Sequence, residues 1–313
     1  MSPAIAVTGV NSYFAKTLLP KLEEDPDIDQ IIGIDVTPWT AHYKKVRFFK
    51  EDIRSPGVAG LLKGVDTVIH LAFIVEEIHD KKKTHQINID GSVNVFKACA
   101  ANRVRKIIYT SSLAAYGAHP DNPTGITEEY PLVQNRDSYY SSDKVAVEGE
   151  VRAFSKDHPE IMITVFRPPV ILGPRVTNSL VDTWQRKVYF YLRGHDPEVQ
   201  FLHEDDLGHA LYLAVKRDMP GVFNITPDKD MTLRDTFRIA GLRIINIPSW
   251  LMKPLANILF ALRLEPMSQG WVSLMEYPIV ASNRKFTQAT GWTPMFTSEE
   301  AFRHFLQSRR SAV

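Results

Sequence analysis

The chain carries the sequence TGVNSYFAKTLL at residues 8–19, directly after the apolar run Ala4–Val7. A strand, a tight turn and a helix in this order form the phosphate-binding end of dinucleotide-binding folds, where three spaced glycines serve the turn, the approach of a pyrophosphate and the packing of the helix. Only Gly9 is present here, since Ser12 and Ala15 stand at the next two glycine positions. Both replacements are small, and a serine hydroxyl can hydrogen-bond a phosphate. Taken alone, the stretch fits a cofactor loop and an ordinary strand–turn–helix equally well.

The next apolar run ends on an acidic residue. It reads QIIGIDV, and Asp35 follows the loop by about twenty residues, where a carboxylate accepts hydrogen bonds from a ribose. Asp35 could instead cap a helix, but Pro38 and Trp39 follow it rather than a helical pattern. The loop and the acid together predict a dinucleotide site. No arginine follows Asp35 directly to neutralise a 2′-phosphate, which favours NAD over NADP.

Strand-like and helix-like segments alternate through the first half of the chain. The apolar, strand-like runs are Ile5–Val7, Ile31–Ile34, Val46–Phe49, Val68–Leu71, Lys106–Thr110 and Met162–Arg167. The helical patterns are Phe14–Glu24, Gly57–Leu62, Ile87–Ala101 and Ser138–Asp157. Such alternation predicts an α/β fold with a doubly wound parallel sheet of the Rossmann type.

The pattern changes after Arg167, where prolines and aromatic residues become frequent and the elements become short. We expect residues 1–167 to form the nucleotide-binding Rossmann domain, with 200–218 returning to it. Residues 168–199 and 219–313 are expected to form a smaller, discontinuous C-terminal substrate lobe.

Composition excludes several classes of protein. The 313 residues include 37 basic and 36 acidic side chains, so no global positive field points to nucleic acid. The lysines at 81–83 are expected to be a solvated loop. Cys99 is the only cysteine, which excludes an intramolecular disulfide and a cysteine-based zinc site, and its apolar neighbours predict a core position. The N-terminal residues lack the pattern of a signal peptide, so we expect a cytoplasmic protein.

The most apolar stretch of the second half is Ile244–Leu264. Pro248, Lys253, Pro254 and Arg263 interrupt it, so stable insertion across a membrane is not expected. We expect a lid or core helix over a substrate pocket. Contact with a membrane surface is the alternative, because apolar periodicity alone does not separate the two.

A tyrosine and a lysine stand one helical turn apart in the sequence YYSSDKVAVEGEV. Tyr140 and Lys144 share one helix face, and an ammonium beside a phenol stabilises the phenolate and eases proton exchange. Tyr139 has Asp143 at the same spacing. Upstream, a predicted strand ends at Ser111–Ser112, where a hydroxyl can bond a substrate oxygen. The pair alone fits a solvated helix face, but the serine and the nucleotide loop together favour catalysis.

These stretches resemble the extended short-chain dehydrogenase/reductase superfamily, in its NAD-dependent epimerase/dehydratase family, over nearly the whole chain. In the first half, TGVNSYFAKTLL is similar to the family's TGxxGxxG loop, EDIRSP to its adenine-contacting Asp-Ile, and VDTVIHLAF to its HLAA strand. NIDGSVNVFKACA is similar to the NVxGTxNVLxAA helix, and YTSSLAAYG to the strand that ends in the family's serine. In the second half, FRPPVILGP is similar to RPxxVYGP, FLHEDDLGHAL to FVHVDDVAxA, and TGWTP to the LGWxP tail.

The resemblance implies NAD as the cofactor, no metal ion, and a site made of Ser112, Tyr140 and Lys144. The residues that it implies for cofactor contact are Gly9, Asn11, Ser12, Tyr13, Phe14, Asp35, Asp52, Ile53, Leu71, Ala72, Asn88, Tyr140, Lys144 and Pro168. The helices at 87–101 and 138–157 match those that form a dimer interface in many relatives, which implies a homodimer.

The implied function is an NAD-dependent oxidoreductase that transfers hydride between nicotinamide and a secondary alcohol or ketone. Family dehydratases place an Asp-Glu pair after the strand-end hydroxyl residue, whereas Leu113 and Ala114 stand here, which argues against dehydration. A nucleotide-sugar epimerase with the same site and a transient keto intermediate is one alternative. A non-catalytic NAD-binding sensor or scaffold is the other.

The resemblance also bears on the substrate. Val170 and Val199 stand where sugar-nucleotide enzymes of the family commonly have asparagine and arginine, although Arg175 could replace one of those contacts. We therefore expect a bulkier and less polar alcohol or ketone rather than a sugar nucleotide. Aromatic residues that could contact it, or could simply form the core of the lobe, are Trp184, Tyr189, Phe190, Trp250, Phe260 and Trp271. The histidines His70, His203 and His209 are expected to be structural, with His203, near Asp206, the strongest exception.

Overall fold

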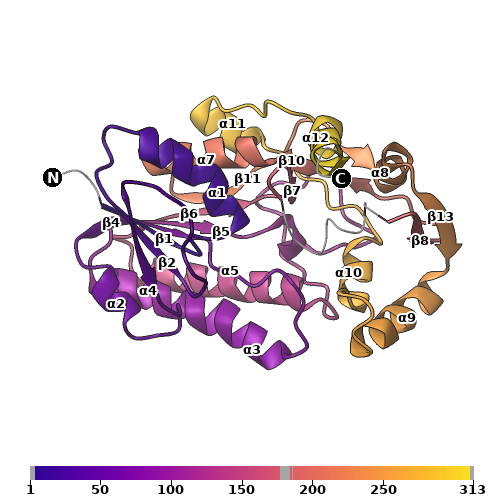
Figure 1. Ribbon diagram of the computed structural model, residues 1–313, viewed down its shortest axis with the longest axis horizontal. Coiled ribbons are helices and arrows are strands. Elements are labelled where there is room, and N and C mark those ends of the chain that lie inside the picture. Colours follow the sequence, from indigo (N-terminus) through magenta and orange to yellow (C-terminus); the bar gives the residue numbers. More distant parts are fainter. Residues whose placement is uncertain (1–3, 177–183, 185, 311–313) are drawn as a thin grey trace.

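Seven parallel strands form the centre of the molecule in the order β11-β6-β5-β4-β1-β2-β3 (Figure 1). This computed structural model describes residues 4–176, 184 and 186–310. The strands are β1 (Ala4–Thr8), β2 (Ile31–Asp35), β3 (Val46–Lys50), β4 (Val65–His70), β5 (Lys106–Thr110), β6 (Met162–Arg167) and β11 (Gly221–Asn224). From β1 the chain adds β2 and β3 outward to one edge of the sheet. It then returns to place β4 on the other side of β1, so the direction of strand addition reverses between β1 and β4. The predicted doubly wound Rossmann sheet is confirmed.

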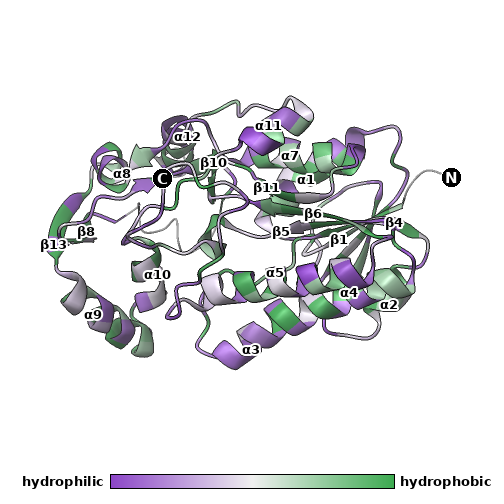
Figure 2. Ribbon diagram, turned by 180° about the vertical axis from the view of Figure 1, so that it is seen from behind, coloured by the Kyte–Doolittle hydropathy of each residue, from purple (hydrophilic) through white to green (hydrophobic). Residues whose placement is uncertain are grey.

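Helices cover both faces of this sheet (Figure 1). One face carries α2 (Val58–Leu61), α3 (Lys81–His85), the π-helical turn η1 (Gln86–Asp90), α4 (Gly91–Ala101) and α5 (Tyr139–Asp157). The other carries α1 (Tyr13–Glu24), α7 (Glu204–Lys216) and α11 (Arg284–Thr290). Hydrophobic residues follow the central strands between these layers (Figure 2), and Cys99 is buried there as predicted. The exposed lysines 81–83 begin α3, capped by Asp80, and do not form the loop that charge alone suggested.

The sheet extends further along the chain than the sequence indicated. Strand β11 lies in the segment expected to belong to the substrate lobe, yet it pairs in parallel with β6. Its Phe223 packs with Phe166 of β6 and with Phe286 of α11, whose ring lies 5.3 Å from that of Phe166. The strand has four residues and begins at a glycine, so it carries little periodic signal.

The remaining elements form a lobe at the end of the molecule far from the N-terminus (Figure 1). Its strands pair as β8 (Val188–Leu192) with β13 (Arg243–Ile247), β7 (Val170–Leu172) with β10 (Phe201–His203), and β9 (Glu198–Val199) with β12 (Met231–Thr232). Its helices are α8 (Leu233–Ala240), α9 (Ser249–Ala261), α10 (Gln269–Leu274) and α12 (Ser298–Arg310). Within the described residues, no helix is both long and apolar enough to cross a membrane.

Gly9 lies where the first loop meets the end of β4. Its φ of +69° is in the left-handed region, which only glycine adopts without strain. A Cβ built on Gly9 would lie 2.6 Å from the backbone nitrogen of Ala72 and 2.7 Å from its Cα. Two backbones therefore touch at the point where the strand order reverses, and a side chain would force them apart.

We expect Gly9→Ala to destabilise the fold by about 3 kcal/mol or more, because backbone strain and collision add. Gly64→Ala is the matched control, since Gly64 also has a positive φ, of +75°, but nothing lies within 4 Å of its added Cβ. That variant should lose only the strain, about 1–2 kcal/mol. Urea unfolding of both variants measures the difference, and equal losses would show that the approach to Ala72 is not limiting.

Candidate active site

The two residues that replace glycines in the first loop have local roles. Ser12 is the N-cap of α1, and its hydroxyl accepts a hydrogen bond from the Ala15 backbone N–H at 3.2 Å. Ala15 itself is completely buried in the core between α1 and the sheet. The turn of Gly9, the helix start and the close packing are therefore all present, and the N-terminus of α1 offers the partial positive charge that attracts a phosphate.

Asp35 ties the end of β2 to this loop. Its carboxylate accepts hydrogen bonds from the Asn11 backbone N–H at 3.0 Å and from the Thr37 N–H and hydroxyl at 2.9 and 2.8 Å. The Asn11 side chain donates to the Thr37 hydroxyl at 2.8 Å. A carboxylate offers roughly four acceptor positions, so a carboxylate with three bonds can still accept one from a ribose hydroxyl.

The other expected cofactor contacts lie along the same edge of the sheet, in three places. Leu71 follows β4 and donates its N–H to the Thr8 carbonyl at 3.1 Å, which holds Ala72 against Gly9. Ile53 is buried after β3, and the neighbouring Asp52 pairs with Arg54 at 2.7 Å, an interaction that lowers the pKa of Asp52. The carbonyl of Pro168, after β6, accepts from the Leu113 N–H at 2.9 Å.

Asn88 lies deeper, under the loop that follows β4. Its side-chain oxygen accepts from the Ile74 N–H at 2.8 Å, and its amide donates to Asp143 at 2.9 Å. Asp143 also bonds His85 at 2.6 Å. Asn88 thus fixes this loop to α5, one residue before Lys144.

The Ser112 hydroxyl lies near the Tyr140 phenol, close enough to influence its pKa. The Ser112 hydroxyl accepts from the Ala114 N–H at 3.1 Å, which leaves its own proton for the phenol oxygen. Burial raises the pKa of Tyr140, and the Ser112 hydroxyl opposes that rise. The structure therefore brings together the strand-end hydroxyl and the phenol that the sequence placed 28 residues apart.

Lys144 lies one turn along α5 with its Nζ donating to the Thr110 carbonyl at 2.9 Å. The same nitrogen is 3.5 Å from the centre of the Phe73 ring and 5.8 Å from that of Tyr140. Burial lowers the pKa of Lys144 to about 7, although Glu148 and Asp143 oppose the shift. An amine that titrates near neutrality can exchange protons at working pH.

Tyr139, the alternative phenol, points elsewhere. Its hydroxyl donates to the Val75 carbonyl in the loop after β4. Ser111, the alternative hydroxyl, is likewise engaged, since it donates to Glu148 at 2.6 Å. Tyr139 and Ser111 thus have structural partners, which agrees with the choice of Tyr140 that its spacing to Lys144 gave and with the choice of Ser112 that the resemblance implied.

Two aromatic residues cover the Tyr140 ring. Trp271 of α10 stacks on it at 5.5 Å between centroids, and Phe73 meets it edge-on at 5.8 Å. Sequence reasoning did not assign either to the catalytic site. Phe73 was detectable, because it departs from alanine in the HLAA pattern, whereas Trp271 is far away in sequence. The buried indole N–H of Trp271 and the Thr110 hydroxyl have no hydrogen-bond partner among the described residues.

A buried polar network supports this site and was also missed. Arg167 donates to both oxygens of Glu148, at 2.8 and 2.5 Å, and to the Tyr116 hydroxyl at 2.7 Å. Tyr116 in turn donates to Asn224 of β11 at 2.8 Å. Because Glu148 is one turn beyond Lys144, the network fixes α5 against β5, β6 and β11.

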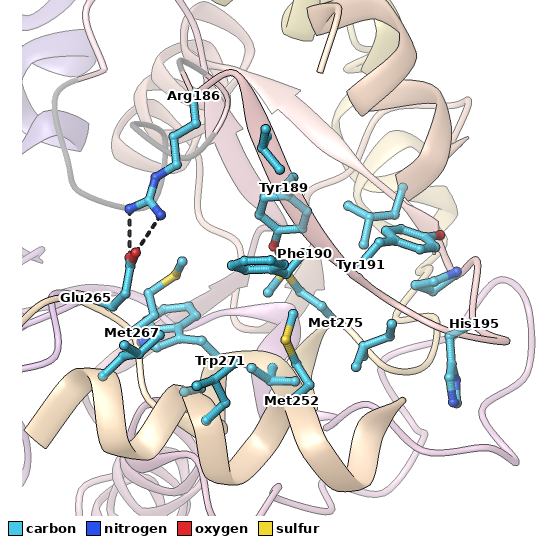
Figure 3. A pocket seen from close by; sticks show the side chains of 18 residues that line it. Arg186, Tyr189, Phe190, Tyr191, His195, Met252, Glu265, Met267, Trp271 and Met275 are labelled. Carbon is cyan, nitrogen blue, oxygen red and sulfur yellow. Dashed lines mark hydrogen bonds and ion pairs between the residues drawn. The ribbon is translucent and has the colours of Figure 1, made fainter. Parts of the chain in front are cut away.

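An apolar pocket of about 110 Å³ lies in the lobe beside Trp271 (Figure 3). Strand β8 forms one wall with Tyr189 and Phe190, and α9 forms the facing wall. The ion pair between Arg186 and Glu265, at 2.7 Å, closes one end. Met252, Leu255, Ala256 and Leu259 point inward from α9, so part of Ile244–Leu264 does cover a pocket. Trp271 belongs to the pocket lining and to the Tyr140 stack at once.

The model of the NAD dependent epimerase/dehydratase family matches residues 5–226. The chain belongs to this family. The recognition made from the motifs is thereby confirmed, and with it an enzyme family whose cofactor is NAD.

The proteins that this epimerase/dehydratase family member resembles differ in the activities that their names state. It is 26% identical to an uncharacterized protein of Mycobacterium tuberculosis over 314 residues, which cover 97% of this chain and 84% of that protein. It is 29% identical over 178 residues to the human sterol-4-alpha-carboxylate 3-dehydrogenase, decarboxylating, covering 55% of this chain and 48% of that one. A UDP-N-acetylglucosamine 4-epimerase from Methanobrevibacter ruminantium M1, solved with UDP-N-acetylmuramic acid, superposes over 100% of both chains with a TM-score of 0.79 and 18% identity, which shows the shared fold.

Two of the three histidines expected to be structural, His70 and His203, have structural partners. His70 is buried between the Thr8 and Ser92 hydroxyls, at 2.6 and 2.9 Å, and burial lowers its pKa to about 3. His203 caps α7 by accepting the Asp205 N–H at 3.2 Å, and burial lowers its pKa to about 4. No group of three metal-ligating side chains occurs within the described part of the chain.

Two polar residues near α7 also have structural partners. Asp206 accepts two backbone N–H groups after the TGWTP tail, those of Met295 and Phe296, at 2.8 and 3.2 Å. Arg175, which could have replaced a sugar-nucleotide contact, pairs with Glu204 at 2.9 Å and with Asp205. The homodimer expected through α4 and α5 stays a prediction.

Proposed function

We propose that this chain is an NAD-dependent dehydrogenase or reductase that acts on a secondary alcohol or ketone. The observation that carries the proposal is the contact of Ser112 with Tyr140 beside Lys144, at the sheet edge where the first loop and Asp35 meet. That edge fits the cofactor, since Gly9 leaves a bare backbone, α1 begins there, and Asp35 retains an acceptor position. When bound, NAD supplies the hydride acceptor or donor.

The residues of the chain supply position and protons. The Ser112 and Tyr140 hydroxyls hold the substrate oxygen, and Tyr140 takes up or releases the proton on that oxygen. Lys144, with its pKa near 7, stabilises the phenolate and passes the proton on, because the ammonium lies one helical turn from the phenol. Trp271 and Phe73 exclude water from the Tyr140 ring. Leu113 and Ala114 offer no acid–base pair, so dehydration is not part of the proposal.

The pocket supports a bulky, largely apolar substrate. Its walls are almost entirely apolar side chains, and Trp271 connects it directly to Tyr140. Val170 is 45% exposed and offers no polar group to a nucleotide. Arg175 is held by two carboxylates, which weakens it as a diphosphate ligand. The sterol named for the human relative fits this class. The sugar nucleotides named for solved neighbours define the second candidate, a nucleotide-sugar epimerase that would use the same three residues.

Binding of the oxidised cofactors tests the role of Asp35. We expect NAD to bind at least about tenfold more tightly than NADP, or about 1.4 kcal/mol, because the carboxylate accepts a ribose hydroxyl but repels a 2′-phosphate. Calorimetric titration of both cofactors measures the ratio. Asp35→Asn should reduce the preference while keeping the shape of the side chain. Equal affinity of the wild-type protein for the two cofactors would contradict this role.

A substrate screen separates the two candidate functions. The NAD-loaded protein is tested by thermal shift and NADH fluorescence against hydrophobic secondary alcohols and ketones and against UDP-, GDP- and dTDP-sugars. We expect stabilisation and turnover with members of the apolar set. For a water-soluble member, Met252→Gln should raise KM because Met252 lines the pocket, whereas Leu251→Gln, on the exposed side of α9, should not. Turnover of a nucleotide sugar with no response to apolar compounds would establish the epimerase instead.

The adjacent tyrosines give a matched pair for the chemical step. Tyr140→Phe should lower kcat by about 100-fold or more with little change in NAD affinity, since it removes the group that exchanges the proton. Tyr139→Phe should cost mainly stability, about 1 kcal/mol for the lost bond to Val75. Steady-state kinetics and NAD titration of both variants decide the assignment. A larger loss of turnover in Tyr139→Phe would mean that the reacting phenol has been misidentified.

A further inference from the structure

Helix α9 is apolar on both of its sides. The inner side lines the pocket, but the outer side is open to solvent: Trp250 is 77% exposed, Leu251 43% and Ile258 57%. Leu262 and Leu264, directly after the helix, are 63% and 66% exposed. We call these five side chains the α9 apolar face. Contiguous large apolar side chains are uncommon on a protein surface, so this face indicates a partner for the outer side of α9.

The chain around the α9 apolar face is basic. Residues 186–193 and 243–264 hold six basic side chains and no acidic one: Arg186, Lys187, Arg193, Arg243, Lys253 and Arg263. Arg186 pairs with Glu265 and Lys253 with Glu276, both at 2.7 Å. The other four are exposed, and none forms an ion pair with another residue of the described chain. The partner is therefore expected to be anionic as well as apolar.

We propose that the α9 apolar face docks on an anionic lipid surface. Large apolar side chains, a tryptophan and surrounding arginines and lysines are the composition of helices that lie in the membrane–water interface. No described helix is long and apolar enough to span the membrane, so the contact is peripheral. A second copy of this chain is a poor occupant, because a two-fold contact would bring the exposed cations Lys187, Arg193, Arg243 and Arg263 of the two copies together, while the neighbouring Glu265 and Glu276 are already paired with Arg186 and Lys253.

The apolar pocket opens beside the α9 apolar face, so docking would place the pocket next to the lipid. Met252 and Leu259 line it from the inner side of the same helix, and the facing lining residues Val188 and Phe190 are 40% and 43% exposed, so the pocket reaches the surface beside α9. An apolar substrate dissolved in the bilayer could pass from the lipid to the pocket without crossing water. This delivery role rests on the proposed function, whereas the docking itself does not.

Vesicle flotation tests the docking, with full-length protein and without NAD or substrate. We expect flotation with vesicles of equal parts phosphatidylglycerol and phosphatidylcholine, weak flotation with phosphatidylcholine alone, and loss of binding as salt is raised. Trp250→Ser with Ile258→Ser should lower the partition coefficient at least tenfold. Met295→Ser is the control, because Met295 is 57% exposed, like Ile258, but lies outside the face. Circular dichroism confirms that each variant is folded.

Two results would overturn the proposal. One is that the wild-type protein does not float with the vesicles, or that the Trp250/Ile258 variant floats as well as the wild-type protein. The other is a dimer in sedimentation velocity that this variant dissociates, which would assign the face to a second copy of the chain. Turnover of a water-soluble substrate in the absence of vesicles is measured separately. If turnover fails while flotation succeeds, the proposed reaction is wrong and the docking stands.

Discussion

The contact between Gly9 and Ala72 is the constraint on which the rest of this structure depends. It is an approach of two backbones with no side chain between them, at the place where the strand order of the sheet reverses. Because the first loop lies against the end of β4, Asp35 can reach Asn11 from β2. The loop that follows Ala72 then carries Phe73 to Tyr140 and Val75 to Tyr139. The cofactor edge and the catalytic edge are therefore positioned by one turn of the chain.

In each of the two adjacent pairs, Ser111–Ser112 and Tyr139–Tyr140, the two residues have different partners. Ser111 and Tyr139 are held by Glu148 and the Val75 carbonyl, while the Ser112 hydroxyl lies near the Tyr140 phenol. One member of each pair thus has a structural role and the other remains available for chemistry. Lys144 lies among aromatic rings, and within the described residues the Thr110 carbonyl is its only hydrogen-bond acceptor. The resulting desolvation explains why its pKa falls toward neutrality.

The Rossmann sheet could be predicted because its signal, strand periodicity, is local, and the proximity of Tyr140 and Lys144 because an i, i+4 pair shares one helix face. The choice of Ser112 came from the resemblance, and the catalytic roles of all three stay predictions. Strand β11 escaped prediction because four residues carry too little periodicity, and its assignment depends on pairing with β6, more than fifty residues earlier. Trp271 was named only as one of six aromatic residues that could contact a substrate, and its stacking on Tyr140 was not predicted, since only tertiary packing brings α10 to Tyr140. The prediction of a lid for Ile244–Leu264 described the inner side of α9 but not its exposed outer side.

Trp271 forms the wall between the pocket and the Tyr140 phenol, so a change in one affects the other. A smaller residue at position 271 would enlarge the pocket but would also remove the ring that stacks on Tyr140. A substrate that fills the pocket would press on the Trp271 ring and through it on Tyr140. Laboratory evolution toward longer or shorter substrates should therefore proceed through other lining residues, such as Tyr189 of β8 and Leu255 of α9, and leave the tryptophan intact. A natural relative with a different residue here would need a second change near Tyr140 to keep its chemistry.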